Sequence, residues 1–350
     1  MKPRDVVLEQ IHHREARPVP YTLGFEGDVA ERLDAHYGSS AWRERLTPYI
    51  VSCAGIDTIR EERVDEIHTR DAFGGLWRHD HRPFYLVEPA MQAASFDNYD
   101  FPDAERFTAP NLEESARKAI DEHPDSFALF GCGWGLFEQS WRIRGFENAL
   151  MDAAADPDFY GELLDRLTDL YLSHVGQAAG VPADAIMFGD DWGDQRGVML
   201  GPERWRKFMK PRWAKIYEAV HAQGKIVISH CCGSVAEIMP DIIEIGLDVL
   251  ESVQPEAEGM NPYELKKRWG DKIAFWGCLG TQSTIPFGSP REIRGEIERL
   301  CREMGRGGGY ILSPAKPIQP ETPTENAAAV VEAFVAQAGS SARPFASQGA

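Results

Sequence analysis

The feature that most constrains the fold is the stretch at residues 186–234, which reads as a strand, a helix and a second strand. Short apolar runs at 186–188 and 226–228 predict the strands. Between them, apolar side chains recur every three or four positions, with Pro202 near the start of the predicted helix and Gly224 at its end. This order predicts two parallel strands joined by a crossover helix.

The same alternation of strand and helix extends along most of the chain. Further strands are predicted near Pro20, within residues 57–87, and ending near residues 130, 253, 276 and 312, which makes eight with the two above. Eight strands alternating with helices predict a (β/α)8 TIM barrel in the α/β class, and a doubly wound sheet is the alternative. One domain is expected over residues 1–338, followed by a disordered tail at 339–350 that is rich in serine, alanine and glycine.

Residues 57–87 are predicted to form a β-rich excursion from the barrel. This stretch is highly charged, and Gly74-Gly75 is a candidate hairpin turn. The sequence does not decide whether this excursion forms a lid over the site or a dimer surface.

Composition and charge limit the kind of partner. The formal net charge of -18 opposes nucleic acid and acidic membrane surfaces as general partners. No apolar run approaches the roughly 20 residues of a membrane helix, and the N-terminus lacks a secretory pattern. A cytoplasmic enzyme acting on a small molecule is therefore expected, with its six cysteines reduced or bound to metal.

Polar side chains at the predicted strand ends are the candidate site, because chemistry in parallel α/β folds collects there. Asp190 and Asp191 follow one strand as candidate catalytic acids, with a helix cap or a salt bridge to Arg196 as the better role for one of the two. His230 and Cys232, two residues apart after the next strand, can point to one side and bind zinc, or can be ordinary core residues. The candidate substrate contacts are Gln254, Gln282, Lys316, Arg142, Arg196 and Trp192, for which loop capping, ion pairing or packing are the alternatives.

From about residue 146 to residue 334, the order of motifs resembles the uroporphyrinogen decarboxylase superfamily. The motifs that carry the resemblance are Gly145-Phe146-Glu147-Asn148, Asp190-Asp191, residues 202–211, His230-Cys231-Cys232-Gly233, Trp269-Gly270-Asp271 and Gly308-Gly309-Tyr310-Ile311-Leu312. The resemblance implies a TIM barrel. It is closer to the cobalamin-linked thiol methyltransferase branch, because residues 21–28 carry two acids and no arginine where true decarboxylases have an arginine-rich segment that binds substrate carboxylates.

The resemblance to thiol methyltransferases implies a zinc ion held by a His-x-Cys pair and a further cysteine after the last strand. His230 and Cys232 match the pair, but Lys316 stands where the further cysteine is expected. We predict that Cys278, at the end of the seventh strand, takes its place on the same rim of the barrel.

The leading functional hypothesis is zinc-assisted transfer of a methyl group between a corrinoid or small methylated donor and a thiol or similar acceptor. The corrinoid would be a substrate or would be carried by a partner protein. One alternative is a decarboxylase-like enzyme that acts on a smaller acid or a tetrapyrrole. A second alternative is a barrel that binds a corrinoid or tetrapyrrole without catalysis.

Overall fold

The computed structural model describes residues 1–339, so the predicted tail lies almost entirely outside the described part of the chain. Seven parallel strands form one sheet whose order follows the sequence, from β1 to β11. Their bounds are β1 (Ile50–Gly55), β6 (Phe127–Trp134), β7 (Ala185–Gly189), β8 (Ile226–His230), β9 (Val249–Val253), β10 (Ala274–Leu279) and β11 (Tyr310–Pro314).

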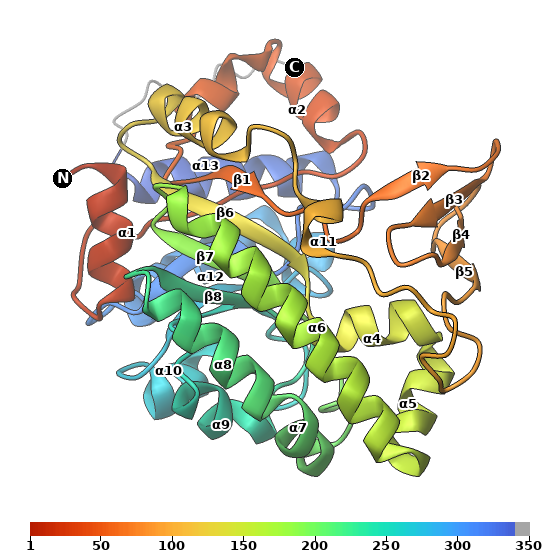
Figure 1. Ribbon diagram of the computed structural model, residues 1–350. Helices are drawn as coiled ribbons and strands as arrows, with labels where there is room; N and C mark the ends of the chain where they lie inside the picture. The colour runs from red at the N-terminus through yellow and green to blue at the C-terminus, as the bar shows by residue number, and fades with distance from the viewer. Residues whose placement is uncertain (340–350) are drawn as a thin grey trace.

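Helices pack around the outside of this curled sheet (Figure 1). The α-helices before β7 are α1 (Pro3–Ile11), α2 (Val29–Tyr37), α3 (Leu112–Glu122), α4 (Leu136–Arg144), α5 (Phe146–Ala155) and α6 (Pro157–Gln177). Those after it are α7 (Pro202–Phe208), α8 (Lys210–His221), α9 (Met239–Glu244), α10 (Pro262–Trp269), α11 (Thr284–Phe287), α12 (Pro290–Glu303) and α13 (Thr324–Gln337). Short 3-10 turns are η1 (Ser40–Arg45), η2 (Ala104–Phe107), η3 (Ala178–Gly180) and η4 (Ala236–Ile238). No helix within residues 1–339 has the length and apolar character to cross a membrane.

The first predicted strand is reduced to isolated bridges, the second of which joins Phe25 to Ile318. Tyr21 pairs with Leu312 of β11, with hydrogen bonds from the Thr22 amide to the Leu312 carbonyl and from the Leu312 amide to Pro20. Prolines at 18 and 20 have no amide hydrogen to donate, so a longer ladder cannot form there. The parallel α/β class is confirmed, and the described strands of the main sheet number seven.

The second predicted strand was assigned to the wrong stretch. The strand that pairs with β6 is β1, immediately before the excursion, and only the 3-10 turn η1 precedes it. A six-residue apolar run fits a strand and a buried helix turn equally well, so its type depends on the sheet beside it.

The excursion forms a sheet of its own. The strands β2 (Glu61–Arg63), β3 (His68–Asp71), β4 (Leu76–Arg78) and β5 (Tyr85–Glu88) pair antiparallel in sequence order. The predicted turn at Gly74-Gly75 connects β3 and β4. In Figure 1 this sheet projects from the side of the molecule toward which β1 and β6 run.

The long helix predicted after β7 is two helices. α7 ends at Phe208 and α8 begins at Lys210, with Pro211 in the first turn of α8. Proline lacks the amide hydrogen that a continuous helix would need at this position but is favoured in a first turn.

Candidate active site

Two loops meet closely where β7 and β8 end. Gly189 pairs with His230 in the sheet, and the Asp190 amide donates to the His230 carbonyl. Beyond them, Gly233 has a φ of +78°, and a Cβ there would lie 2.5 Å from the Asp194 carbonyl oxygen. Only glycine fits this conformation and this contact. The close approach of the two backbones brings Asp191 beside Cys232.

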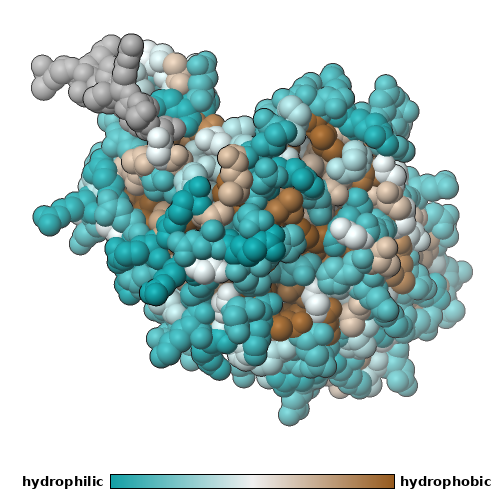
Figure 2. Space-filling model, turned by 90° about the vertical axis from the view of Figure 1, so that its left-hand side faces the viewer, coloured by the Kyte–Doolittle hydropathy of each residue, from teal (hydrophilic) through white to brown (hydrophobic). Residues whose placement is uncertain are grey.

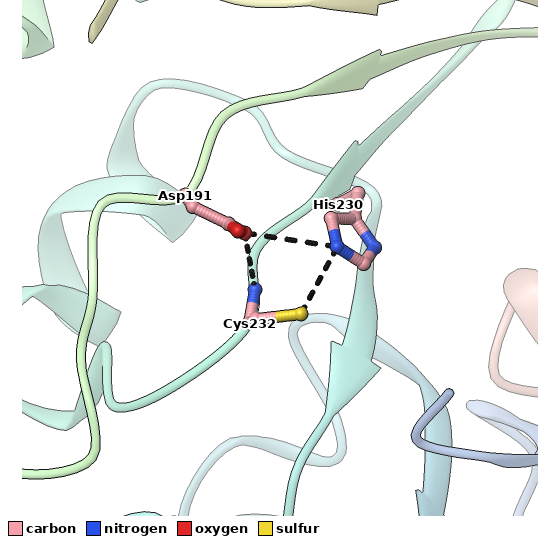
Figure 3. Close-up of side chains that lie close together, drawn as sticks. All are labelled: Asp191, His230 and Cys232. Atoms are coloured by element: carbon pink, nitrogen blue, oxygen red, sulfur yellow. Dashed lines mark hydrogen bonds and ion pairs between the residues drawn. The ribbon is translucent and has the colours of Figure 1, made fainter. Parts of the chain in front are cut away.

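Asp191, His230 and Cys232 form a cluster with the composition of a metal site (Figure 3). Each residue offers one ligand atom, and these atoms lie within 4.8 Å of one another. His230 Nε2 is 3.2 Å from Cys232 Sγ and 3.6 Å from Asp191 Oδ1. The Cys232 amide donates to Asp191 Oδ1 at 2.7 Å, which fixes the carboxylate against the loop.

Glu251, from β9, orients the imidazole of His230. Its carboxylate contacts His230 Nδ1, and the two residues are register partners in neighbouring strands. In the neutral form of the imidazole, Nδ1–H donating to Glu251 would leave the Nε2 lone pair directed at the cluster, which is the tautomer that a metal ligand needs. Burial alone would lower the pKa of His230, but Glu251 and Cys232 outweigh it and raise that pKa well above its usual value.

The two adjacent cysteines have different surroundings. Cys231 is buried, and its Sγ accepts from the Trp192 amide at 3.2 Å. Cys232 is half-buried and lies beside His230. Successive residues of an extended segment face opposite sides, so residues two apart face the same side. The His-x-Cys spacing therefore brings His230 and Cys232 together, as predicted.

The two adjacent aspartates also differ. Asp190 is fully buried and accepts from the amides of Phe137 and Glu138, in the first turn of α4. Its Oδ2 also accepts from the indole N–H groups of Trp192 and Trp213. Burial raises the pKa of Asp190 to about 7, while these donors act to lower it. Asp190 therefore caps a helix, the role expected for one of the pair, and Asp191 is the residue at the cluster.

Glu138 is a site residue that sequence reasoning missed. It lies on α4, is 8% exposed, and its strongest charged neighbours are Asp191, Asp190 and His230. Burial, with the two aspartates, raises the pKa of Glu138 to about 8. Nothing around Glu138 in the sequence distinguishes it from a surface acid. Glu251, also missed, carries a signal, since it is the one charged residue in the apolar run of β9.

The structure does not bring Cys278 to the cluster. Cys278 lies inside β10, is 2% exposed, and has Glu296 of α12 and Lys266 of α10 as its nearby charges. These helices pack outside the sheet, whereas the cluster lies where the strands end. Asp191 is the third potential ligand instead.

The predicted substrate contacts are dispersed. Arg142 is buried in ion pairs with Glu61 and Asp71, and the exposed Arg196 lies 3.7 Å from Asp194. Trp192 is 1% exposed, in the core beside Trp205 and Trp213. Gln254 lies close to the cluster, because its Oε1 accepts from the Gly233 amide. Gln282 and Lys316 are exposed.

Comparison with known proteins gives two kinds of relative. Residues 74–336 match the uroporphyrinogen decarboxylase (URO-D) family. A uroporphyrinogen decarboxylase of Coxiella burnetii (strain Dugway 5J108-111) is 25% identical over 247 residues, covering 66% of this chain and 66% of that protein. The methylcobamide:CoM methyltransferase MtaA of Methanosarcina barkeri is 27% identical over 179 residues, covering 50% of this chain and 48% of that protein.

A solved structure shares the fold over nearly its whole length. A methyltransferase from Methanosarcina mazei superposes with a TM-score of 0.70 at 20% sequence identity, covering 95% of this chain and 98% of that one. At this identity the likeness bears on the fold alone, and it agrees with a TIM-like arrangement of the parallel sheet and its helices.

Proposed function

Because this chain belongs to the uroporphyrinogen decarboxylase (URO-D) family, whose members similar to it include decarboxylases and a methyltransferase, we propose that it is a methyltransferase. It passes a methyl group between a corrinoid or small methylated donor and a thiol or similar acceptor, and the corrinoid is free or carried by a partner protein. The observation that carries this proposal is the cluster of Asp191, His230 and Cys232.

The donor set of the cluster fits zinc. Imidazole nitrogen, thiolate sulfur and carboxylate oxygen are the three kinds of ligand that zinc takes in proteins, and three protein ligands leave one position for a substrate. Bound zinc supplies a means of keeping a substrate thiol as its thiolate, a strong nucleophile near neutral pH. The oxygen of Asp191 stands in for the cysteine sulfur that Cys278 was predicted to provide.

The residues around the cluster fix its geometry. Glu251 holds the His230 ring with Nε2 toward the ligand position, and such carboxylates make a histidine a better ligand. Gln254 holds the Gly233 amide, and the Cys232 amide holds Asp191. Glu138 adds a carboxyl group that is protonated near neutral pH, because its pKa is raised to about 8.

The decarboxylase alternative has less support from the arginines. An enzyme for a polycarboxylic acid needs arginines free to bind carboxylates. Arg142 and Arg144 are each buried in ion pairs with carboxylates of this chain, and Arg196 lies near Asp194. Arg142 and Arg196 are the two arginines that were predicted to contact substrate.

The first test is the metal content of the protein purified without added zinc. We expect about one zinc per chain in the wild type, as for other catalytic zinc sites with three protein ligands. Cys232→Ser and Asp191→Ala should each lose most of it. Cys278→Ser is the matched control and should keep the full amount, because Cys278 lies away from the cluster. Elemental analysis of the four proteins decides the ligand set.

The second test is methyl transfer by the zinc-loaded protein, with methylcobalamin as donor and a small thiol as acceptor, followed by loss of the methylcobalamin absorbance. Transfer that Cys232→Ser abolishes supports the proposal. Wild-type protein without metal contradicts the zinc mechanism. Carbon dioxide release that survives chelation and His230→Ala favours the decarboxylase, and copurification of a corrinoid protein with no turnover favours the binding barrel.

A further inference from the structure

Most arginines on the surface of this protein are paired with acids. The face shown in Figure 2 is mostly hydrophilic, as expected for a chain rich in charged residues. Within residues 1–339, most arginines form an ion pair with a carboxylate of the chain. Three in this range that do not, Arg60, Arg70 and Arg106, lie around one hollow. Guanidinium groups that share a hollow and have no carboxylate partner suit an anion as ligand.

The excursion sheet and the turn η2 both contribute to this hollow. Its volume is about 190 Å³, and the residues that line it are Arg60, Glu62, Arg70, Asp71, Ala72, Glu105 and Arg106. The three arginines come from the loop after β1, from β3 and from η2, so segments distant in the chain supply them. None of the lining residues belongs to the cluster of Asp191, His230 and Cys232. The hollow is therefore separate from the candidate metal site.

Two of the three arginines are held in place by backbone carbonyls. Arg60 Nη1 donates to the Arg106 carbonyl at 3.2 Å, and Arg70 Nη1 donates to the Gly74 carbonyl at 2.6 Å. A guanidinium has five N–H groups, so each of these side chains keeps further donors for a ligand. The Arg60 carbonyl accepts from the Ala72 amide, which joins the loop after β1 to the excursion sheet. The arginines are therefore partly ordered before a ligand arrives, which lowers the cost of binding.

Three acids also line the hollow, and their surroundings differ. Asp71 is buried and already pairs with Arg142. Glu62 and Glu105 are exposed and form no ion pair within residues 1–339, although Glu62 is the register partner of Arg70. A carboxylate at the edge of an anion site accepts a hydrogen bond from a protonated oxygen of the ligand and repels an oxygen without a proton. The lining therefore favours an anion that also carries an O–H group.

We propose that this hollow binds inorganic phosphate in its monohydrogen form. The charged oxygens of the ligand accept hydrogen bonds from Arg60, Arg70 and Arg106. Its one P–O–H group donates to Glu62 or Glu105. Salt screens the net charge of -18 beyond about 10 Å, so the arginines beside the hollow determine whether an anion is attracted there. Bound phosphate joins β2 and β3 to η2 and fastens the excursion sheet to the segment beside it.

The test is calorimetric titration of the purified protein with inorganic phosphate at constant ionic strength. We expect one site per chain with a dissociation constant of about 1 mM or lower. Arg70→Ala and Arg106→Ala should each raise this constant about tenfold or more, because each removes charge-assisted hydrogen bonds. Arg63→Ala is the matched control, since Arg63 is an exposed arginine of β2 that does not line the hollow, and it should bind as the wild type does. Binding that Arg70→Ala and Arg106→Ala leave unchanged overturns the proposal, because the phosphate then lies elsewhere, the metal-type cluster included.

Sulfate provides the second arm of the test. It has nearly the size and charge of monohydrogen phosphate but no proton to donate at neutral pH, so the wild type should bind it about tenfold more weakly or worse. Replacing both glutamates, Glu62→Gln with Glu105→Gln, should remove this difference, because an amide can donate to sulfate. Phosphate should also slow hydrogen exchange in residues 61–71 and 104–107. Equal binding of the two anions by the wild type, or no saturable binding of phosphate, overturns the proposal.

Discussion

Adjacent residues in this site have opposite roles, and the backbone decides which is which. Asp190 and Asp191 are alike in sequence, but one faces the helix α4 and the other faces the metal-type cluster. Successive side chains of an extended segment point to opposite sides, so the sequence alone predicts that Asp190 and Asp191 face different surroundings. Which aspartate faces which side depends on the register of β7 against β8, and that register is set by contacts distant in sequence.

The aspartate pair gives a prediction that separates folding from metal binding. Asp190→Ala leaves four N–H donors without an acceptor in a fully buried position, so the free energy of unfolding should fall by about 3 kcal/mol or more. Asp191→Ala should change it by less than about 1 kcal/mol in the metal-free protein, because Asp191 is half-exposed. Urea unfolding in the presence of a chelator measures both. Equal losses in the two variants would contradict this division of roles.

Glu138 predicts a pH dependence of stability. Its pKa of about 8 in the folded chain lies above the usual 4.5, so the folded state holds a proton that the unfolded chain has released. The contribution of Glu138 to the free energy of unfolding is therefore fully present below pH 4.5 and is lost as the pH rises toward 8. Glu138→Gln removes this loss, so the stability of the wild type relative to this variant should fall by about 1.4 kcal/mol per pH unit in that window.

Urea unfolding of the metal-free proteins between pH 5 and pH 7.5 gives the measurement. Asp190, whose pKa is also raised, acts in the same direction and is present in both proteins, but it interacts with Glu138, so the difference reports the two coupled carboxyl groups. Parallel stability curves for the wild type and Glu138→Gln would show that the carboxyl group is already ionised in the fold.

At the scale of elements, the excursion sheet depends on one buried side chain. Arg142 was predicted as a candidate substrate contact, with ion pairing as the alternative, and its partners are two carboxylates of this chain, Glu61 and Asp71. The sequence places these acids more than sixty residues away, and no local pattern links them to α4. The β-rich character of residues 57–87 was predictable from its alternation and glycines, whereas its attachment was not.

Removing Arg142 should release the excursion sheet while the main sheet stays folded. Arg142→Met leaves two carboxylates, in partly or fully buried positions of β2 and β3, without the arginine. We expect this to lower the stability of these strands by about 3 kcal/mol or more. Hydrogen exchange should therefore rise in residues 61–88 and remain low in β6 to β11. Arg63→Met, which alters an exposed arginine of β2, is the control. Uniformly raised exchange across the chain would mean that Arg142 supports the whole fold.

At the scale of the whole molecule, alternation of strands and helices was enough to predict a parallel α/β sheet, because each crossover needs a helix of its own. The two errors in strand placement both lie before residue 60, where prolines shorten the Tyr21 segment and β1 has no helical or strand periodicity of its own. Cys278 was expected at the site because it lies at the exit of the seventh predicted strand, on the same rim of the barrel. β10 continues through it, so its side chain belongs to the packing between the sheet and the outer helices rather than to the strand ends.

The indole rings that hold Asp190 give the protein an optical reporter at its own site. The indole N–H of Trp192 donates a hydrogen bond to Asp190, and Trp192 follows Asp191 directly in the chain. The rings of Trp205 and Trp213 pack against its ring. Its backbone amide also touches Cys231, the neighbour of both His230 and Cys232. Any ion or substrate that draws Asp191 and Cys232 together therefore acts beside Trp192, the next residue in the chain, so occupation of the site should change the intrinsic tryptophan fluorescence.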